Sequence, residues 1–317
     1  MRGIPLIDMC GTADVIHSIE NACHDIGFMY VAGHGISSEV ISQIRSTVVD
    51  YFELPSDLKI EDQISQENYR GYIPQGFFSP NSGGTAADSY EGYKLHQEIE
   101  VADPVCAACD LYGPNKWPRR PKHFKRNVLN YWRECDRVAL ELLGAMAEIL
   151  GTAKDQFLQL FDKPLTNMTL LHYPPQDDES TRFGIHPHKD TDALTILAPE
   201  AVGGLFIRHR DDQEWIKADP PADALIVNIG DLLELWSGGY FVSTPHKVIN
   251  SSGKHRYSFP YFAVPRFDTV VEPIRTPLAD FDRSKVHVGD VSKDVWRTNW
   301  PGVMPDNPMH DLGTLEN

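Results

Sequence analysis

The sequence lacks any run of about 18 or more apolar residues, the length that a helix needs to cross a membrane. Its first residues, MRGIPLIDMCG, contain neither a basic segment followed by an apolar stretch nor a leader cleavage site. Cysteine is scarce and odd in number, with five in 317 residues, which excludes a disulfide scaffold and fits reduced thiols. These absences predict a cytoplasmic protein with no membrane contact.

The cysteines include one closely spaced pair, Cys106 and Cys109, in the order C-A-A-C. A structural zinc ion needs four ligands, typically from a second such pair, and none follows. A redox-active pair needs a βαβ setting, which the flanking residues do not indicate. We therefore interpret the pair as two loop thiols.

Positive charge is also in short supply. The chain has 29 Lys and Arg residues against 45 Asp and Glu residues, a formal net charge of −16 and a pI near 5.2. Most of such a surface repels a polyanion, so we expect no nucleic-acid partner and no anionic membrane partner, although a local basic pocket remains compatible with it. No feature indicates an obligate protein partner.

Apolar residues, in contrast, are abundant enough for a large core. Hydrophobic residues make up 41% of the chain, which predicts a compact fold, and sandwiches and barrels of more than 200 residues exist as one unit. We expect a single integrated fold in three stretches. These are an N-terminal αβ and loop-rich region over residues 1–120, a long helix with a jelly-roll core over 121–275, and a C-terminal extension over 276–317.

The first sixty residues predict alternating strands and helices. Residues 4–8 and 28–35 are apolar runs typical of strands. The 3.6-residue apolar period between them predicts a helix that Thr12 caps and that stops at Gly27. A second helix is expected between a cap at Ser37 or Ser38 and the helix breaker Pro55.

The rest of the chain predicts loops, one long helix and then strands. Residues 62–120 are rich in Gly, Pro and Asn without a sustained period, which indicates loops. An apolar stripe over residues 121–151 predicts a long core-facing helix. Beyond about residue 165, short β-branched runs broken by Pro, Gly and Asp are typical of a sandwich or barrel. From Leu278 on we expect a covering helix, a lid or a frayed tail.

The expected fold class is therefore α+β and β-rich. It has a double-stranded β-helix core of the jelly-roll or cupin-like kind, with N-terminal helices and one long supporting helix.

Four potential metal ligands alternate along the segment HPHKDTD at residues 186–192. In a strand, His186, His188, Asp190 and Asp192 would all leave the same face. Four ligands from one row are more than a single site normally takes, so the pattern alone leaves open which of them bind.

Two later segments supply partners from other parts of the barrel. His246 begins the strand-like run HKVIN, and Arg256 and Ser258 stand two residues apart in RYS, on one strand face. A barrel brings such distant strands together around one interior point. The expected cluster contains histidine and carboxylate side chains, with an arginine deeper in the pocket.

These motifs, in this order, resemble the isopenicillin N synthase-like Fe(II)- and 2-oxoglutarate-dependent dioxygenases. The resemblance covers roughly residues 4 to 275. The matching core segments are HKDTDALTIL (188–197), NIGDLLELWSGGYFVSTPHKV (228–248) and RYSFPYF (256–262). The N-terminal segments IPLID, CHDIGFMYVAGHGIS, YFELPSDLK and NYRGY are also similar to that family.

The resemblance implies that His188, Asp190 and His246 are the catalytic Fe(II) ligands. The family's H-x-D pair corresponds to His188 and Asp190 because the residues that follow also match, which leaves His186 and Asp192 outside the site. Two imidazoles and one carboxylate on one face of iron leave three adjacent positions open, for a chelating 2-oxo acid and for O2.

The resemblance further implies that Arg256 and Ser258 bind the 5-carboxylate of 2-oxoglutarate and that Tyr173 contacts the same co-substrate. Leu171 departs from the asparagine that many plant members have at its position. The alternative for Arg256 is an ion pair with a nearby acidic side chain.

Six side chains lie in segments that line the family's substrate pocket, and each of them also suits ordinary packing. They are Arg70, Tyr72, Phe77, Tyr93, Phe183 and Phe262.

The activity that the resemblance implies is the oxidation of a C–H bond in a small-molecule metabolite, by hydroxylation, desaturation or cyclisation, as in secondary metabolism. It consumes O2 and 2-oxoglutarate, releases succinate and CO2, and uses ascorbate as an accessory reductant.

Three alternatives stay open at this point. The first is an Fe(II) oxidase of the same fold that does not use 2-oxoglutarate, since the R-x-S pair occurs in such relatives too. The second is a zinc hydrolase, because HPHKD resembles an HxHxDH motif, although Thr191 stands where that motif needs its last histidine. The third is a non-catalytic jelly-roll binding module.

Overall fold

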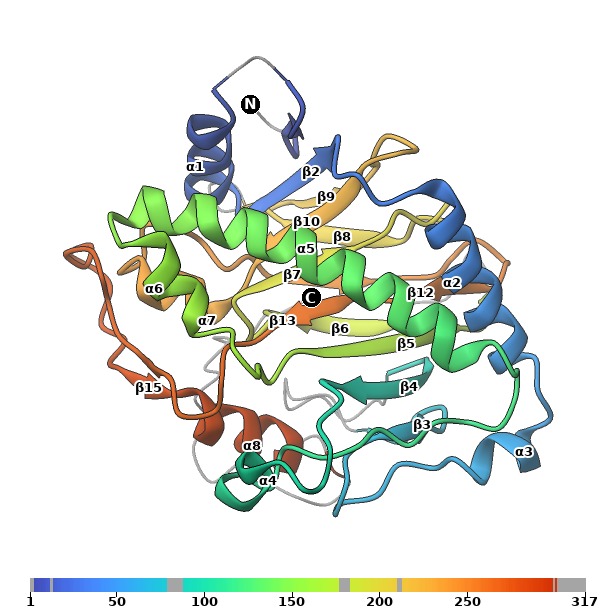
Figure 1. Ribbon diagram of the computed structural model, residues 1–317. Helices are drawn as coiled ribbons and strands as arrows, with labels where there is room; N and C mark the ends of the chain where they lie inside the picture. The colour runs from blue at the N-terminus through green and yellow to red at the C-terminus, as the bar shows by residue number, and fades with distance from the viewer. Residues whose placement is uncertain are drawn as a thin grey trace.

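The computed structural model of the chain describes residues 3–11, 14–78, 88–176, 183–209, 213–298 and 300. Two β-sheets face each other, and helices cover the outer face of the larger sheet (Figure 1). This arrangement confirms the predicted α+β class with a double-stranded β-helix core. Within the described ranges, no helix has the length and apolar character needed to span a membrane.

The larger sheet has nine strands among the described residues and draws on both halves of the chain. All its neighbouring pairs are antiparallel except β1 with β2. The order is β1 (Leu6–Asp8), β2 (Phe28–Ala32), β10 (Leu225–Ile229), β7 (Leu194–Leu197), β13 (Tyr261–Ala263), β5 (Asn167–Tyr173), β4 (Glu91–His96) and β3 (Gly71–Ile73), and β12 (Arg256–Ser258) also pairs with β5.

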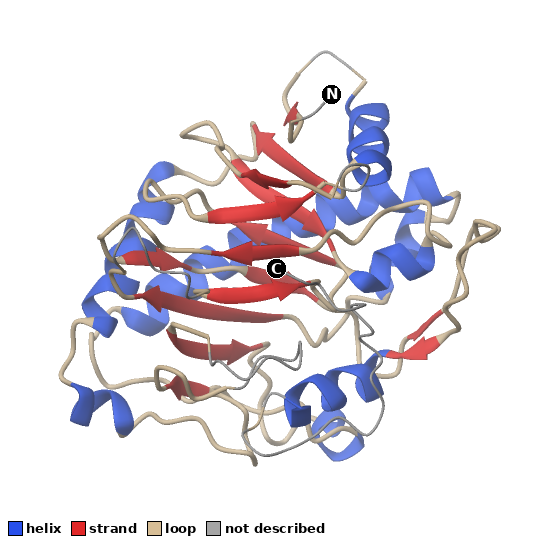
Figure 2. Ribbon diagram, turned by 180° about the vertical axis from the view of Figure 1, so that it is seen from behind, coloured by secondary structure: helices blue, strands red, loops and turns tan. Residues whose placement is uncertain are grey.

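The smaller sheet lies against the inner face of the larger one and is seen in front of it in Figure 2. Its order is β6 (Ile185–His188), β11 (His246–Val248), β8 (Leu205–Arg208) and β9 (Trp215–Lys217). Leu205 and Ile207 of this sheet share a buried cluster with Phe28 and Tyr173 of the larger sheet. A two-stranded ribbon of β14 (Val270–Val271) and β15 (Val286–His287) stands apart.

The outer face of the larger sheet is buried under helices. The long helix α5 (Phe124–Leu150) crosses this face, with α2 (Ser38–Phe52) beside it (Figure 1). Leu142 and Met146 of α5 are fully buried in one cluster with Leu170 of β5, as the apolar stripe predicted. Burying one such side chain stabilises the fold by about 1.5–3 kcal/mol. The remaining helices are α1 (Val15–Asp25), α3 (Ser56–Ile60), α4 (Pro104–Ala108), α6 (Lys154–Gln159), α7 (Asp231–Trp236) and α8 (Val288–Thr298).

Helix ends follow the expected chemistry, with one correction. Ser37 caps α2 by accepting a hydrogen bond from the Val40 backbone N–H, and α5 ends at Gly151 with φ +75°. Helix α1 is capped by Asp14, whose carboxylate accepts from the His17 N–H. The predicted cap, Thr12, lies outside the described residues.

Loops dominate the described part of residues 62–120, as predicted, but the sequence did not reveal the regular elements within it. The segment contains β3, β4 and α4, and β4 is a six-residue strand between β3 and β5. Tyr93 and Leu95 alternate with Lys94 and His96, but Glu91 puts a charge on the apolar face, so only a short alternation marks the strand in the sequence. Cys106 and Cys109, interpreted as loop thiols, lie in and directly after α4 and are both free.

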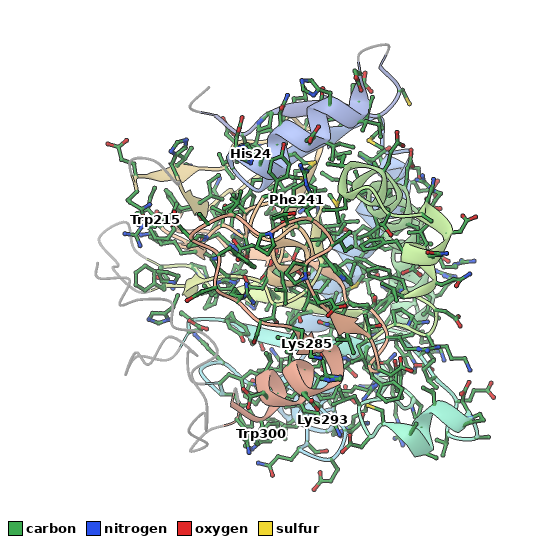
Figure 3. All side chains as sticks on the ribbon, turned by 90° about the vertical axis from the view of Figure 1, so that its left-hand side faces the viewer. His24, Trp215, Phe241, Lys285, Lys293 and Trp300 are labelled. Carbon is green, nitrogen blue, oxygen red and sulfur yellow. The ribbon has the colours of Figure 1, made fainter. Side chains whose placement is uncertain are left out.

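The C-terminal extension forms a covering helix over residues 288–298. Its Trp296 stacks on Tyr69, with ring centroids 4.7 Å apart, and lies 4.2 Å from the ring of His96. In Figure 3, Trp300 and the helix that carries Lys293 lie at the opposite end of the molecule from His24 on α1. Helix α7, which the sequence did not predict, connects β10 to the segment that leads to β11.

Candidate active site

Three metal-ligating side chains meet between the two sheets. His188 is the last residue of β6, Asp190 follows two residues later, and His246 is the first residue of β11, directly opposite His188 in the ladder. One ligand atom from each lies within 4.8 Å of the others. The pairing of β6 with β11 thus brings together side chains 58 positions apart in the chain.

Both imidazoles present the Nε2 atom to the same point. The Nδ1 of His188 donates to the His186 carbonyl oxygen at 2.8 Å, and the Nδ1 of His246 donates to the Thr244 carbonyl oxygen at 3.2 Å. A carbonyl oxygen only accepts, so each Nδ1 carries the proton and a neutral ring leaves Nε2 free to bind a metal. Burial lowers the pKa of His246 to about 4, which keeps this ring neutral.

Asp190 uses its two oxygens differently. Its Oδ2 accepts hydrogen bonds from the Thr195 hydroxyl at 2.5 Å and from the Asn228 amide at 2.8 Å. Its Oδ1 lies 3.7 Å from the Nε2 of both His188 and His246. Burial would raise the pKa of Asp190, but the two histidines and the two hydrogen bonds hold it below its ordinary value. The carboxylate is therefore ionised and its Oδ1 is free to bind a metal.

The donor set and its spacing fit a divalent first-row metal. Two imidazole nitrogens and one carboxylate oxygen form the facial triad that non-haem Fe(II) oxygenases use. Ligand atoms at about 2.0–2.2 Å from one ion lie about 3 Å apart in adjacent positions. The 3.7 Å distances between these ligand atoms therefore need to shorten by less than about 1 Å.

Backbone hydrogen bonds fix the loop that carries Asp190 to the junction of β10 and α7. The Asp231 N–H donates to the Asp190 carbonyl at 2.8 Å, and the Leu232 N–H donates to the Asp192 carbonyl at 3.0 Å. A Cβ at Gly230 would stand 2.1 Å from the Asp192 carboxylate, so only glycine fits there. This contact gives the segment NIGDLL a structural role in positioning the metal ligand.

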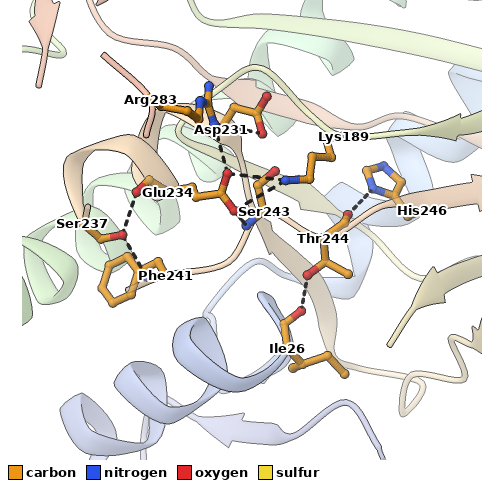
Figure 4. A network of polar contacts seen from close by, with 10 residues as sticks. All are labelled: Ile26, Lys189, Asp231, Glu234, Ser237, Phe241, Ser243, Thr244, His246 and Arg283. Atoms are coloured by element: carbon orange, nitrogen blue, oxygen red, sulfur yellow. Dashed lines mark hydrogen bonds and ion pairs between the residues drawn. The ribbon is translucent and has the colours of Figure 1, made fainter. Parts of the chain in front are cut away.

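A second network positions His246 (Figure 4). The Glu234 carboxylate accepts from the Ser243 N–H at 2.9 Å and pairs with Arg283 at 3.0 Å. The Thr244 hydroxyl donates to the Ile26 carbonyl at 2.7 Å, which anchors the residue whose carbonyl orients the His246 ring. Glu234 thus holds Ser243, and the Ile26 carbonyl holds Thr244, directly before β11.

The other two members of the alternating row are engaged elsewhere. The Nδ1 of His186 lies 2.5 Å from the Asp88 carboxylate, which also accepts from the His186 backbone N–H. The Asp192 carboxyl lies 2.9 Å from the Thr195 hydroxyl oxygen, whose single proton goes to Asp190, and burial and the charge of Asp190 raise the pKa of Asp192 well above the ordinary value. Asp192 is therefore neutral, and the structure brings neither side chain into the cluster.

Arg256, Ser258 and Tyr173 lie together on the inner face, where β12 pairs with β5. The Arg256 guanidinium lies 4.7 Å from the centre of the Tyr173 ring, and its Nε donates to the Gly203 carbonyl. Burial lowers the pKa of Arg256, yet its Nη1 has no hydrogen-bond partner, and no acidic side chain of the described residues pairs with it. A buried, unpaired guanidinium N–H is costly, so this arrangement fits a bound carboxylate. Burial raises the pKa of Tyr173 to about 12, so it remains a neutral phenol.

Two of the six expected substrate residues lie on the outer face of the larger sheet. Tyr72 donates to Glu91 and Tyr93 donates to the Lys116 carbonyl, and both pack around Tyr51 on the outer, helix-covered face. The structure therefore does not bring these two tyrosines to the metal cluster.

The other four lie elsewhere. Arg70 is buried and donates to the Asn68 and Leu111 carbonyls, and Phe77 packs on Trp300 with ring centroids 5.2 Å apart. Phe183 lies 4.8 Å from the ring of His186. Phe262 faces the interior, since it pairs with both Asn167 and Thr195.

Sequence reasoning missed Thr195, Asn228 and Lys94. Thr195 and Asn228 each interrupt an apolar strand run, ALTIL and ALIVNI, and a polar residue in such a run was the available signal. Lys94 of β4 points into the interior and donates to Asn167 and Thr169 of β5.

Comparison with known proteins agrees with this geometry. Residues 165–265 match the family described as the 2OG-Fe(II) oxygenase superfamily, and residues 4–120 match the N-terminal region of the non-haem dioxygenases in morphine synthesis. The chain is 31% identical over 266 residues to the homoarginine-6-hydroxylase 2-ODD-C23.2 of Arabidopsis thaliana, covering 83% of this chain and 73% of that protein. It is 30% identical over 268 residues to the 2-oxoglutarate-dependent dioxygenase thnC of Trichoderma harzianum, covering 80% and 82%.

A solved structure shares the fold. This full-length protein of Neurospora crassa, crystallised in complex with alpha-KG and thymine, superposes with a TM-score of 0.80 at 23% identity, covering 92% of this chain and 96% of that one.

Proposed function

The chain belongs to the 2-oxoglutarate- and Fe(II)-dependent oxygenase superfamily, and on that premise we propose that it oxidises a C–H bond of a small molecule with His188, Asp190 and His246 as its iron ligands. Two Nε2 atoms at 3.7 Å from one carboxylate oxygen that is free of hydrogen bonds are the observation that supports this assignment best. Fe(II) bound there supplies the activation of O2 that is coupled to the conversion of 2-oxoglutarate to succinate and CO2.

We propose that Arg256 holds the 5-carboxylate of 2-oxoglutarate with its free Nη1, that Ser258 adds a hydroxyl donor, and that Tyr173 supports the guanidinium. Leu171 pairs with Ser258 on the same inner face and contributes apolar contact there. The side chains that bind the co-substrate thus come from adjacent positions of β5 and β12.

The enzyme's own side chains keep the ligand set in its binding form. Thr195 and Asn228 hold the Asp190 carboxylate ionised and oriented, and the carbonyls of His186 and Thr244 hold each imidazole with Nε2 forward. Asp190 and His246 therefore do not have to lose a proton before iron binds near neutral pH.

The experiment that tests this function measures succinate and O2 together. Anaerobically purified protein is loaded with Fe(II), given 2-oxoglutarate and screened with small molecules as O2 is admitted. We expect one succinate per O2 consumed in coupled turnover, with ascorbate sustaining it. O2 uptake without succinate would instead indicate the 2-oxoglutarate-independent oxidase.

Two further outcomes would also contradict the proposal. Full zinc occupancy with hydrolase activity would favour the zinc enzyme, and unchanged function in His188→Ala would favour a binding module.

We propose a small-molecule metabolite as the primary substrate. One relative is named for homoarginine and one structural neighbour was solved with thymine, so the relatives differ in what they bind. We further propose a cytoplasmic enzyme without nucleic-acid, membrane or obligate protein partners, which the net charge of −16 supports for polyanions.

A further inference from the structure

Lys94 lies on the inner face of the larger sheet. In the antiparallel register Lys94 pairs with Thr169, so both side chains leave the same face, while the neighbouring pair Tyr93 and Leu170 faces the helices. The Lys94 ammonium donates to the Asn167 Oδ1 at 2.6 Å and to the Thr169 hydroxyl at 3.0 Å. It also lies 5.3 Å from the centre of the Phe262 ring.

The inner face is accessible at this point. Lys94, Asn167, Thr169 and Phe262 all keep accessible surface, although each sits in the middle of a sheet. Their neighbours on the outer face are closed, with Met168, Leu170 and Leu95 at 0% exposure. The four accessible side chains therefore share the space above the inner face of the larger sheet at this point.

The remaining hydrogen-bonding capacity of this group is donor capacity. Lysine has three N–H donors and no acceptor, so the Asn167 atom that it contacts is the carbonyl oxygen and the Thr169 oxygen acts as an acceptor. This leaves the third N–H of Lys94, the Asn167 NH2 group and the Thr169 hydroxyl proton without an acceptor among the described residues. Three side chains thus offer donors into the same space, which is the chemistry of an anion site.

The charge of Lys94 has no partner within ion-pair distance among the described residues. The carboxyl groups of Asp190 and Asp192 act on its charge only from beyond ion-pair distance, and both already contact the Thr195 hydroxyl. Burial lowers the pKa of Lys94 to about 7, and a bound anion would stabilise its charged form. A bound carboxylate would therefore supply the counter-charge that no described side chain provides to Lys94.

A row of side chains connects this site to the metal ligands. Phe262 pairs with Asn167 on one side and with Thr195 on the other, and Thr195 donates to Asp190. Two strand spacings, about 10 Å, separate Asn167 from Thr195, which is the span of a small molecule. The co-substrate site at Tyr173 lies four residues along β5 from Thr169, about 13 Å away.

We propose that Lys94, with Asn167 and Thr169, binds a carboxylate of the primary substrate and holds the adjoining part of the molecule over Phe262 toward the metal ligands. This inference rests on the proposed function and narrows its substrate to a small organic acid. One ammonium group balances the single charge of a carboxylate, whereas a phosphate monoester would bring about 1.5 to 2 negative charges.

Equilibrium binding to the enzyme loaded with Fe(II) and 2-oxoglutarate, without O2, tests the assignment. The probes are matched pairs of acid and primary amide on the same apolar body, beginning with 3-phenylpropanoate and 3-phenylpropanamide, together with phenyl phosphate. We expect wild-type enzyme to prefer acids, and Lys94→Met to weaken acid binding roughly 10–100-fold while amide binding changes less than about 2-fold.

Two variants complete the design. Lys94→Arg keeps the charge and should keep the acid preference. Lys125→Met is the matched control, because Lys125 lies 5.0 Å from the Trp117 ring on the outer surface and its loss should alter neither affinity.

Three results would overturn the proposal. They are equal binding of acid and amide in every pair, an equal loss of both in Lys94→Met, which would indicate a structural lysine, and tighter binding of phenyl phosphate than of the acid. The ratio of acid to amide affinity does not depend on turnover, so it is separate from the succinate measurement that tests the proposed function.

Discussion

Asp190 illustrates how single side chains are specialised in this site. One carboxylate oxygen is held by Thr195 and Asn228, and the other is left to the two histidines. Because hydrogen bonds to one oxygen fix the orientation of the other, residues that never touch the metal control how well it binds. The same logic applies to the carbonyls that hold His188 and His246 in one tautomer.

Replacing Thr195 tests this indirect control. Thr195→Val keeps the shape but removes the hydroxyl that bonds Asp190 at 2.5 Å. We expect iron affinity to fall roughly 10–100-fold, the range typical of outer-shell partners. Thr195→Ser restores the donor and should restore affinity in the same anaerobic Fe(II) titration. Equal weakening by both substitutions would mean that packing, not the hydrogen bond, is what Thr195 contributes.

The two aspartates of the alternating row should behave in opposite ways. Asp190→Ala removes the only carboxylate ligand, so we expect iron retention and succinate formation to be lost. Asp192→Asn replaces a neutral acid by a neutral amide whose NH2 group can still donate to the Thr195 hydroxyl oxygen, and it should retain iron. Metal content per chain after anaerobic reconstitution and desalting measures both, and iron loss in Asp192→Asn would place that residue in the site.

The sequence predicted the site residues that belong to a linear motif, but not those that strand pairing brings together. The order of His188, Asp190, His246 and Arg256 is a linear pattern, and the resemblance identified it. The position of Lys94 near Asn167, in contrast, depends on strand register across β4 and β5, which only the folded sheet defines. A lysine in a segment expected to be a loop gave no reason to place it inside.

Among the elements, β4 links the two sides of the sheet. Its outward-facing Glu91 accepts from Lys59 of α3 at 2.7 Å, from Tyr72 of β3 at 2.5 Å and from His172 of β5 at 2.7 Å. Three elements are therefore joined through one buried carboxylate. This network lies on the face opposite the metal ligands, so its role is structural.

Breaking the network should destabilise the fold without removing the site. Glu91→Gln leaves the buried Lys59 ammonium without a counter-charge, which costs about 3–5 kcal/mol. We expect a lower unfolding midpoint in urea, followed by tryptophan fluorescence. The double variant Lys59→Met with Glu91→Leu should recover part of the loss, because an apolar pair has no unpaired charge. A Glu91→Gln midpoint equal to wild type would show that solvent already satisfies Lys59.

The same network predicts a pH dependence with a defined sign. Burial would raise the pKa of Glu91, but the bonds from His172, Lys59 and Tyr72 bring it below its ordinary value. A carboxyl whose folded pKa is lowered contributes stability above its unfolded pKa, about 4.3, and loses it as pH falls through the folded value. The stability gap between wild type and Glu91→Gln should therefore be constant from pH 8 to about 6 and shrink below about pH 4. A gap that widens on acidification would contradict this sign.

Secondary structure was predictable where the period was long and apolar. Helix α5 has 27 residues with one continuous apolar face. Pro121 and Gly151 allowed its start and its end to be predicted from the sequence. Strand β4 and helix α7 have six residues each, and β4 carries the charged Glu91 on its apolar face, so the period in each is too short to identify the element. Short elements with buried polar residues obtain their structure from their neighbours.

At the scale of the whole molecule, the two faces of the larger sheet have separate tasks. The outer face packs against α2 and α5 and forms the main apolar core. The inner face, opposite the smaller sheet, carries the metal ligands, the free Arg256 and Lys94. The ligand-binding polar groups are thus concentrated on the inner face, whereas the Glu91 network of the outer face is paired internally and the apolar core there supplies stability. Composition predicted the core, but this division between the faces came only from the topology.

Ligands that complete the inner face should therefore stabilise the entire fold. The metal ligands and Arg256 come together only when β5, β6, β11 and β12 have folded into the sheets. We therefore expect Fe(II) and 2-oxoglutarate to bind the folded state and not the unfolded state. At 100 times its dissociation constant, a ligand adds about 2.7 kcal/mol to the free energy of unfolding. With an unfolding entropy of about 2.1 cal/mol/K for each of 317 residues, this raises Tm by about 4 °C per ligand. Anaerobic scanning calorimetry with Fe(II), then with added 2-oxoglutarate, should give two successive rises. In Arg256→Met only the first should remain, and a full second rise in that variant would place the co-substrate carboxylate elsewhere.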